Sequence, residues 1–265
     1  MTPPIILTIA GSDCSSGAGI QADIKTISAL KGYAASVITA ITAQNTLGVQ
    51  AVYPLPADIV EAQIKSVMDD LHPNAIKIGM VHDSSIVHAI AQCLQKYQPK
   101  IVIYDPVMIS TSGRRLMTEE TIQTIKDELF PLCTLITPNL DEASFLLNQT
   151  IMDIKTMESA ARRLSDNYHT SVLIKGGHLI GNEMCDILYS EGHIHQFKQQ
   201  KIESRNLHGT GCTLSSAITT FLAKGKRLDE SVRQAKAYIN IAIGNGKGLQ
   251  IGQGNGPLGH FTFEE

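Results

Sequence analysis

Several features that would assign this chain to a common class of binding protein are missing from its sequence. None of the five cysteines forms a C-x-x-C pair, which argues against a zinc site or a disulfide framework. Lysine and arginine number 22 against 25 acidic residues, a formal net charge of −3, and they form no basic run. A phosphate backbone would find little to bind, so nucleic acid is not an expected partner.

The sequence also has few long apolar segments, and we expect no export signal. The chain starts with a short apolar run, Ile5 to Ala10, without a preceding basic region, which does not fit a signal peptide. The stretch from Gly32 to Ala57 has no charges, but polar residues and prolines interrupt it, and it is predicted as a core strand plus a loop. We therefore expect a cytoplasmic protein with no membrane partner.

The composition predicts a well-packed α/β protein. Of the 265 residues, 43% are hydrophobic and only 18% are charged, which is enough apolar material for a single domain over residues 1–265. Short runs rich in isoleucine and valine alternate with stretches of helical period. This pattern predicts a central, mostly parallel sheet flanked by helices on both faces, with a small β-hairpin near residues 184-198. The expected sheet strands are Ile5-Ala10, Ser36-Ile41, Ala75-Ile78, Ile101-Tyr104, Thr134-Ile136 and Ser171-Ile174.

Small, polar or charged residues follow each expected strand. In an open parallel sheet the ligand crevice lies at the carboxyl ends of the strands, so these residues are expected to share one site. Any one of them alone would more often be a solvated loop residue. The strand-end groups are Gly11-Ser12-Asp13, Gln44-Asn45, Gly79-Met80, Asp105-Pro106, Asn139 to Glu142, and Lys175-Gly176-Gly177.

A glycine motif after the first strand is typical of nucleotide-binding folds but is incomplete. Residues 17–22 read G-x-G-x-x-A, yet no acidic residue for a ribose ends the next strand, and the chain has no Walker A loop. Asp23 stands in the first helical turn, where a carboxylate can accept hydrogen bonds from a small ligand. We therefore expect the two glycines, Gly17 and Gly19, to let the backbone approach a compact substrate.

A second glycine-rich turn, His208-Gly209-Thr210-Gly211-Cys212, comes directly before an amphipathic helix. Backbone N–H groups at a helix start form an anion cradle, although Thr210 as an ordinary N-cap explains the pattern equally well. Cys212 favours the functional interpretation, because a thiol at a helix start is expected to have a lowered pKa and to accept a proton. The alternative for a lone cysteine is a small buried packing residue.

The segment Asn139-Leu140-Asp141-Glu142 has the spacing of a helix capping box. The same spacing, with Asp105 at a neighbouring strand end, allows Glu142 to bind Mg²⁺ through water. Lys175 would add a positive charge for nucleotide phosphates.

Taken in order, these motifs closely resemble the hydroxymethylpyrimidine/phosphomethylpyrimidine kinases of thiamine biosynthesis, a family of the ribokinase-like superfamily. The resemblance runs from Ile6 to about Phe261. Its motifs are Ala10-Gly11-Ser12-Asp13, Gly17-Ala18-Gly19-Ile20-Gln21-Ala22-Asp23, Thr39-Ala40 through Ala43-Gln44-Asn45-Thr46, Lys77-Ile78-Gly79-Met80, Asp105-Pro106-Val107-Met108, Thr137-Pro138-Asn139, Lys175-Gly176-Gly177-His178, His208-Gly209-Thr210-Gly211-Cys212-Thr213 and Gly254-x-Gly256-Pro257.

The resemblance implies a ribokinase-like fold and an ATP-dependent and Mg²⁺-dependent kinase that phosphorylates a hydroxymethylpyrimidine and then its monophosphate. It implies that Gln44 and Asp23 bind the aminopyrimidine in a pocket lined by Gly11, Ala18, Met80 and Val107. It also implies that Asn139, Glu142 and Asp105 organise Mg-ATP, that Lys175 contacts phosphate, that Gly209, Thr210 and Gly211 form the anion hole, and that Cys212 replaces the usual catalytic aspartate. A homodimer is expected on the same ground.

The first loop departs from the family pattern, because Cys14 stands in place of proline and Ser16 in place of glycine. Two other functions remain open at this point. Related chains with the same Gly-Thr-Gly-Cys element phosphorylate pyridoxine or pyridoxal, although Met80 and Gln44 favour the pyrimidine. A non-catalytic pyrimidine or nucleotide sensor is the second alternative, against which the presence of Cys212, Lys175 and Glu142 argues.

Overall fold

The computed structural model describes residues 2–108, 117–177 and 183–261. Within these ranges, nine strands form one sheet in the order β3-β2-β1-β4-β5-β6-β7-β8-β9. The strands from β2 to β7 in that order are parallel, while β3, β8 and β9 are antiparallel to their neighbours. The strand bounds are β1 Ile5–Asp13, β2 Tyr33–Asn45, β3 Gly48–Pro54, β4 Ala75–Ile78, β5 Val102–Tyr104, β6 Leu135–Ile136, β7 Ser171–Ile174, β8 Glu183–Ser190 and β9 His193–Gln200.

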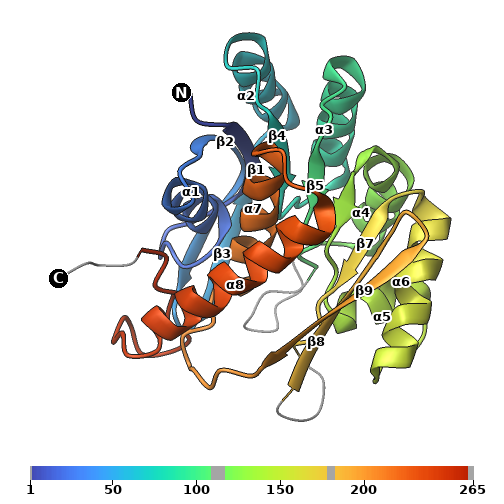
Figure 1. Cartoon of the computed structure of the whole chain (residues 1–265). Coiled ribbons are helices and arrows are strands. Elements are labelled where there is room, and N and C mark those ends of the chain that lie inside the picture. Colours follow the sequence, from blue (N-terminus) through green and yellow to red (C-terminus); the bar gives the residue numbers. More distant parts are fainter. Residues whose placement is uncertain (1, 109–116, 178–182, 262–265) are drawn as a thin grey trace.

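Helices cover both faces of the sheet (Figure 1). Strand β5 shows why, because Ile103 packs toward α7 and α8 while Val102 and Tyr104 pack into the core on the opposite face. Since side chains alternate along a strand, a fully apolar run must be covered on both sides. The helices are α1 Gly19–Ala29, α2 Ala57–Asp70, α3 Ser84–Tyr97, α4 Glu119–Thr124, α5 Leu140–Leu147, α6 Ile154–Tyr168, α7 Thr210–Ala223 and α8 Leu228–Gly246. A π-helical turn, Ile125–Leu129, and a 3₁₀ turn, Phe130–Leu132, follow α4.

The predicted sheet and the hairpin of β8 and β9 are confirmed, with two differences. Strands β1 and β2 run beyond Ala10 and Ile41 into the polar residues that follow them. The stretch 48–54, predicted as loop, is strand β3, which pairs antiparallel with the end of β2. Pairing with β3 supplies the hydrogen bonds that extend β2. No periodic pattern of apolar residues in the sequence indicated this pairing. One sheet runs through residues 5–200, and the single domain over residues 1–265 stays a prediction.

The strand order reverses beside β1, since β2 lies on one side of it and β4 on the other. At such a reversal the connections leave in opposite directions, which opens a crevice at the carboxyl ends of the strands. The residues that end β1 and follow β4, Asp13 and Met80, therefore border the expected ligand site. Within the described part of the chain, no helix combines the length and the apolar character needed to cross a membrane.

Candidate functional site

Asp13 organises the loop that joins β1 to α1. Its Oδ2 atom accepts hydrogen bonds from the backbone N–H groups of Gly17 at 3.0 Å and Ala18 at 2.8 Å, and its Oδ1 atom accepts from Ser15. Burial raises the pKa of this carboxyl, but His208 and these donors outweigh it and lower the pKa to about 2. Asp13 is therefore an anion that holds the loop in shape at neutral pH.

His208 joins this loop to the residue predicted to bind the pyrimidine. Its Nε2 atom lies 3.0 Å from Asp13 Oδ2 and 2.9 Å from the Nε2 atom of Gln44. The thiol of exposed Cys14 lies against the backbone of Gln44, donating to its carbonyl at 3.1 Å and accepting from its N–H at 3.3 Å. Loop and strand end thus form one hydrogen-bonded unit in which Cys14 takes part.

The two glycine-rich turns pack against each other. A Cβ atom on Gly17 would lie 2.2 Å from His208 Cδ2, and one on Gly209 would lie 1.9 Å from the Gly17 carbonyl oxygen. Gly19 has a positive φ, and a Cβ atom on it would lie 2.3 Å from the Gly11 carbonyl oxygen. In the direction of a Cβ atom, both glycines make room for protein atoms, and the expected approach of their backbone to a substrate stays a prediction.

The start of α7 has the form of an anion cradle. Gly209 is the N-cap residue with φ 85°, so the alternative of Thr210 as N-cap is wrong. Thr210 also leaves the predicted cradle, because its N–H donates back to the Leu207 carbonyl at 3.2 Å. The N–H groups of Gly211 and Cys212 find no partner among the described residues, so they are the donors that an anion would meet.

The expected lowering of the Cys212 pKa is also wrong. Burial raises the pKa of this thiol to about 11, and the charges of Asp23 and Asp105 act in the same direction. Lys77 and the N–H of Gly19 lower it, but by less. Position at a helix start therefore does not decide the thiolate fraction here, because loss of water outweighs the helix dipole.

Asp23 does not face the space where a substrate would bind. Its side chain is 0% exposed, and its two oxygens accept hydrogen bonds from Lys77 at 2.9 and 3.0 Å. Thr8 and Ser216 donate to the same carboxylate at 2.6 and 2.7 Å. The predicted contact between Asp23 and the aminopyrimidine is replaced by a buried ion pair that ties α1 to β4 and α7.

A small apolar surface lies at the ends of β1, β2 and β4. Met80, 9% exposed, packs with Ala40, and Val107 and Val52 pack against them. Gly11 lies beside Met80, since a Cβ atom there would be 3.3 Å from its sulfur. Three of the predicted pocket residues, Gly11, Met80 and Val107, are thus brought together. Ala18 lies at the other side of the loop, next to Gly209.

Charged residues gather on the side of the cradle away from Gln44. Lys175 Nζ lies 2.7 Å from Asp105 Oδ1, and Gly211 lies next to both side chains. Burial alone would raise the pKa of Asp105, but Lys175 and Lys77 hold it below its usual value. Thr137 also donates to Asp105 at 2.9 Å. This pair gives the cradle a cation and an anion within reach of one ligand.

The capping box at the start of α5 is confirmed. The Asn139 side chain accepts from the Glu142 N–H at 2.9 Å, and Glu142 Oε2 accepts from the Asn139 N–H at 2.8 Å. Glu142 Oε1 accepts a longer bond from the Met108 N–H at 3.4 Å. Burial raises the pKa of Glu142 to about 7, although Lys175 lowers it in part. This carboxyl would gain from a nearby cation.

No three His, Cys, Asp or Glu side chains in the described residues are grouped so as to enclose a metal ion. Asp105 and Glu142 therefore do not form a direct cage. A hydrated Mg²⁺ does not need one, because this ion keeps most of its water and contacts one or two carboxylates. The buried Glu142 and Asp105 carboxyls fit that mode of binding.

Sequence reasoning missed the roles of His208 and Lys77. In the sequence His208 stands out only as part of a glycine motif, because its partners Asp13 and Gln44 lie far away along the chain. Lys77 had a usable signal, because a lysine in the middle of the apolar strand β4 has to be buried and paired.

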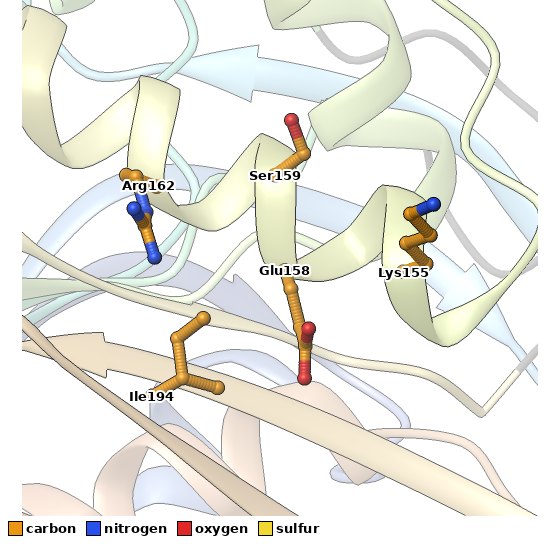
Figure 2. A pocket seen from close by; sticks show the side chains of 5 residues that line it. All are labelled: Lys155, Glu158, Ser159, Arg162 and Ile194. Carbon is orange, nitrogen blue, oxygen red and sulfur yellow. The ribbon is translucent and has the colours of Figure 1, made fainter.

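A separate hollow lies between α6 and β9, away from the strand ends (Figure 2). It is lined by the exposed cations Lys155 and Arg162 and by the partly buried Glu158, which already accepts a hydrogen bond from Gln196 at 2.7 Å. Such a lining is ordinary for a helix surface, and this hollow is not part of the candidate site. The residues that line it are Lys155, Glu158, Ser159, Arg162 and Ile194.

Comparison with known proteins places the chain among vitamin kinases. The family model described as "Phosphomethylpyrimidine kinase" matches residues 13–259. A hydroxymethylpyrimidine/phosphomethylpyrimidine kinase of Rhizobium meliloti is 48% identical over 97% of each chain. A thiamine biosynthesis bifunctional protein, ThiED, of Geobacter sulfurreducens is 43% identical over 98% of this chain, which spans only 53% of that longer protein.

Solved structures agree with the fold. The crystal structure of phosphomethylpyrimidine kinase from Clostridium difficile 630 superposes with a TM-score of 0.81 at 44% identity, covering 91% of this chain and 99% of that one. The pyridoxal kinase of Staphylococcus aureus in complex with AMP-PCP superposes with a TM-score of 0.90 at 32% identity, covering 98% and 94%. The predicted ribokinase-like architecture is confirmed.

Proposed function

Because the chain belongs to the phosphomethylpyrimidine kinase family, we propose that it transfers a phosphoryl group from ATP to the hydroxymethyl group of 4-amino-5-hydroxymethyl-2-methylpyrimidine, and then to the resulting monophosphate, in thiamine biosynthesis. The observation that carries the proposal is the position of the cradle. The N–H groups of Gly211 and Cys212 have no partner among the described residues, Gly211 lies beside the Asp105–Lys175 pair, and His208 connects the same turn to Gln44.

Each side of the cradle has the chemistry that one of the two substrates needs. Gln44 offers an amide to the polar edge of an aminopyrimidine, while Met80 and Val107 offer apolar contact to its ring. On the other side Lys175 supplies a positive charge for the phosphates of ATP. Phosphoryl transfer depends mainly on positioning and charge neutralisation, and this arrangement provides both.

In the proposed reaction the hydroxymethyl oxygen attacks the γ-phosphorus, the bond to the bridging oxygen breaks, and ADP leaves. The thiolate form of Cys212 accepts the hydroxyl proton and becomes the thiol, and the N–H groups at the start of α7 stabilise the transferred group. Asp105 and Glu142 would hold hydrated Mg²⁺, which neutralises phosphate charge when bound. Asn139 keeps Glu142 in place through the capping box.

The test is steady-state kinetics on the hydroxymethylpyrimidine, its monophosphate and pyridoxal, each under saturating Mg-ATP. We expect kcat/KM for the pyrimidine to exceed that for pyridoxal by about tenfold or more, which corresponds to about 1.4 kcal/mol of transition-state discrimination. Absence of a phosphorylated pyrimidine would refute the proposal.

Pyridoxal phosphorylation remains the second candidate because of structural similarity. Pyridoxal kinases superpose over 98% of this chain, but at 32–34% identity, below the 48% reached by the Rhizobium pyrimidine kinase. A preference for pyridoxal in the same assay would favour it. The non-catalytic sensor is not supported, because the similar proteins are named as kinases.

We also propose that the protein forms a homodimer. The hairpin of β2 and β3 carries exposed apolar side chains, with Ile41 at 49%, its cross-strand partner Tyr53 at 67%, and Leu47 at 64% exposure. Contiguous exposed apolar side chains often mark association surfaces. Light scattering should give twice the monomer mass, and the monomer mass across a wide concentration range would contradict the proposal.

A further inference from the structure

The hydrogen-bond network around His208 can be completed with either the oxygen or the nitrogen of the Gln44 amide facing the ring. One ring nitrogen, Nε2, lies 3.0 Å from Asp13 Oδ2 and 2.9 Å from the side-chain amide of Gln44. Ionised Asp13 can only accept hydrogen bonds, so the ring nitrogen facing it must carry a hydrogen. The low pKa of Asp13, about 2, ensures that it is ionised at neutral pH. His208 Nε2 is therefore a donor.

A donor at His208 decides which end of the Gln44 amide faces it. Two N–H groups cannot face each other at 2.9 Å, and the two ends of an amide are distinguished only by their hydrogen bonds. With the amide oxygen toward His208, the ring N–H is shared between Asp13 and Gln44. The amide NH₂ group then faces Thr42 Oγ1, which lies 3.2 Å from the other end of the Gln44 amide. Thr42 is able to accept there, since its own hydrogen is donated to the Ser12 carbonyl at 3.0 Å.

We propose that His208, held by Asp13, is a specificity-determining positioning residue that fixes the amide orientation of Gln44 and so determines which ring edge the pocket binds. In this orientation Gln44 retains one N–H and one oxygen lone pair, side by side, for a ligand. That pair complements a ring nitrogen next to an exocyclic amino group, as an amide does when it binds adenine. The choice of ligand rests on the proposed function, whereas the amide orientation does not.

The geometry also explains why the orientation is stable. His208 is 7% exposed and its ring edge lies in the space left by the missing Cβ of Gly17. Asp13 is 3% exposed and is held by the backbone N–H groups of Gly17 and Ala18. Neither side chain is able to turn without losing buried hydrogen bonds, so the amide of Gln44 meets a fixed donor.

The first test measures the tautomer directly, without any substrate. Long-range ¹H–¹⁵N NMR of the histidine rings in the ligand-free protein at neutral pH should show a hydrogen on His208 Nε2. The His208 signals are assigned by their loss in His208→Gln. A bare Nε2 would overturn the proposal, whatever the protein phosphorylates, so this result is independent of the proposed function.

The second test compares kcat/KM for the aminopyrimidine with that for its analogue carrying hydrogen in place of the amino group. We expect His208→Leu to reduce the preference for the amino compound about tenfold, mainly through KM, because the amide loses its fixed orientation. His208→Gln supplies an N–H in a similar place and should keep the preference within about threefold. An equal loss on both substrates would mean that His208 only supports the fold, and would overturn the proposal.

A matched control is available on the surface. His88 pairs with Glu128 at 2.7 Å, but this histidine is half exposed and lies on α3. His88→Leu removes a histidine–carboxylate pair of similar length and should leave the substrate preference unchanged. If the wild type phosphorylates neither compound, the proposed function fails, and the NMR result still decides the amide orientation.

Discussion

At the scale of single residues, Cys212 shows how the environment of a side chain outweighs its position on a helix. Its thiol stands at the third residue of α7, where the helix dipole favours an anion, yet burial raises its pKa to about 11. At pH 7 such a thiol is ionised in only about one molecule in 10⁴. So small a thiolate fraction limits the rate of phosphoryl transfer unless ligand binding lowers the pKa of Cys212.

Cys212→Ser is therefore expected to keep ligand binding, because the cradle is backbone, and to lower kcat by ~10²- to 10⁴-fold. In the wild type, kcat should rise with pH above neutrality, because the thiolate fraction grows as the pH approaches 11. The measurement is a pH–rate profile of both proteins. An unchanged kcat in the serine variant would make Cys212 a packing residue, and the proton would then leave by another route, such as the phosphoryl oxygens.

Glu142 combines a structural and a proposed catalytic role in one side chain. Burial raises its pKa from 4.5 to about 7, so the folded protein retains a proton there that the unfolded chain loses at lower pH. The free energy of unfolding that this raised pKa contributes is fully present below pH 4.5 and is lost as the pH rises to about 7. The loss amounts to at most about 3 kcal/mol.

Glu142→Gln removes this titration while keeping a side-chain oxygen for the capping box. We expect the variant to unfold at a higher urea concentration than the wild type at pH 8 and at a similar one at pH 4, with a lower kcat and a weaker response to Mg²⁺. Urea unfolding at the two pH values and Mg²⁺ titrations of activity check this. Equal stability of the variant and the wild type at pH 8 would show that ionisation of buried Glu142 does not lower the free energy of unfolding.

At the scale of elements, the contact between the two glycine turns joins α1 to α7. Gly209 has φ 85° and leaves no room for a Cβ atom, while Gly225 at the other end of α7 has φ 81° and open space around it. The two positions share a left-handed φ and differ in crowding. They form a matched pair for testing the contact.

Gly225→Ala should cost about 1 to 2 kcal/mol of stability from the left-handed backbone alone. Gly209→Ala should cost at least about 3 kcal/mol, because the Gly17 carbonyl has to move, and activity should fall as the cradle shifts. Thermal unfolding and kinase assays of both variants measure the difference. Equal costs would mean that the turns are able to separate freely.

At the scale of the whole molecule, the buried Lys77–Asp23 pair, with the Thr8 and Ser216 hydroxyls that donate to it, connects two strands and two helices beneath the site. Lys77→Met leaves the charge of Asp23 buried without its partner and should cost about 3 to 5 kcal/mol. The double variant Lys77→Met with Asp23→Asn removes both charges and should recover part of that loss, as measured by urea unfolding. Lys65→Met, in an exposed pair with Glu61, is the control and should change stability little. Equal instability of the single and double variants would contradict the account.

The sequence by itself determined the class of the fold and the side of the sheet that carries the site. Apolar runs of strand length and helical periodicity are local patterns, and so is the capping box of Asn139 and Glu142, which the structure confirms. The polar residues at the strand ends follow from the same patterns. Resemblance then assigned roles to Gln44, Met80, Val107 and Lys175, which remain proposals.

Only the tertiary structure decided which of these residues meet. The order of strands placed β1 between β2 and β4, and it turned Asp23 toward Lys77 rather than toward a ligand. Close packing set the direction of the Cys212 pKa and made His208 the link between two loops. These outcomes depend on contacts between residues far apart in the chain and on loss of water around them, and no local pattern of apolar and polar residues encodes either.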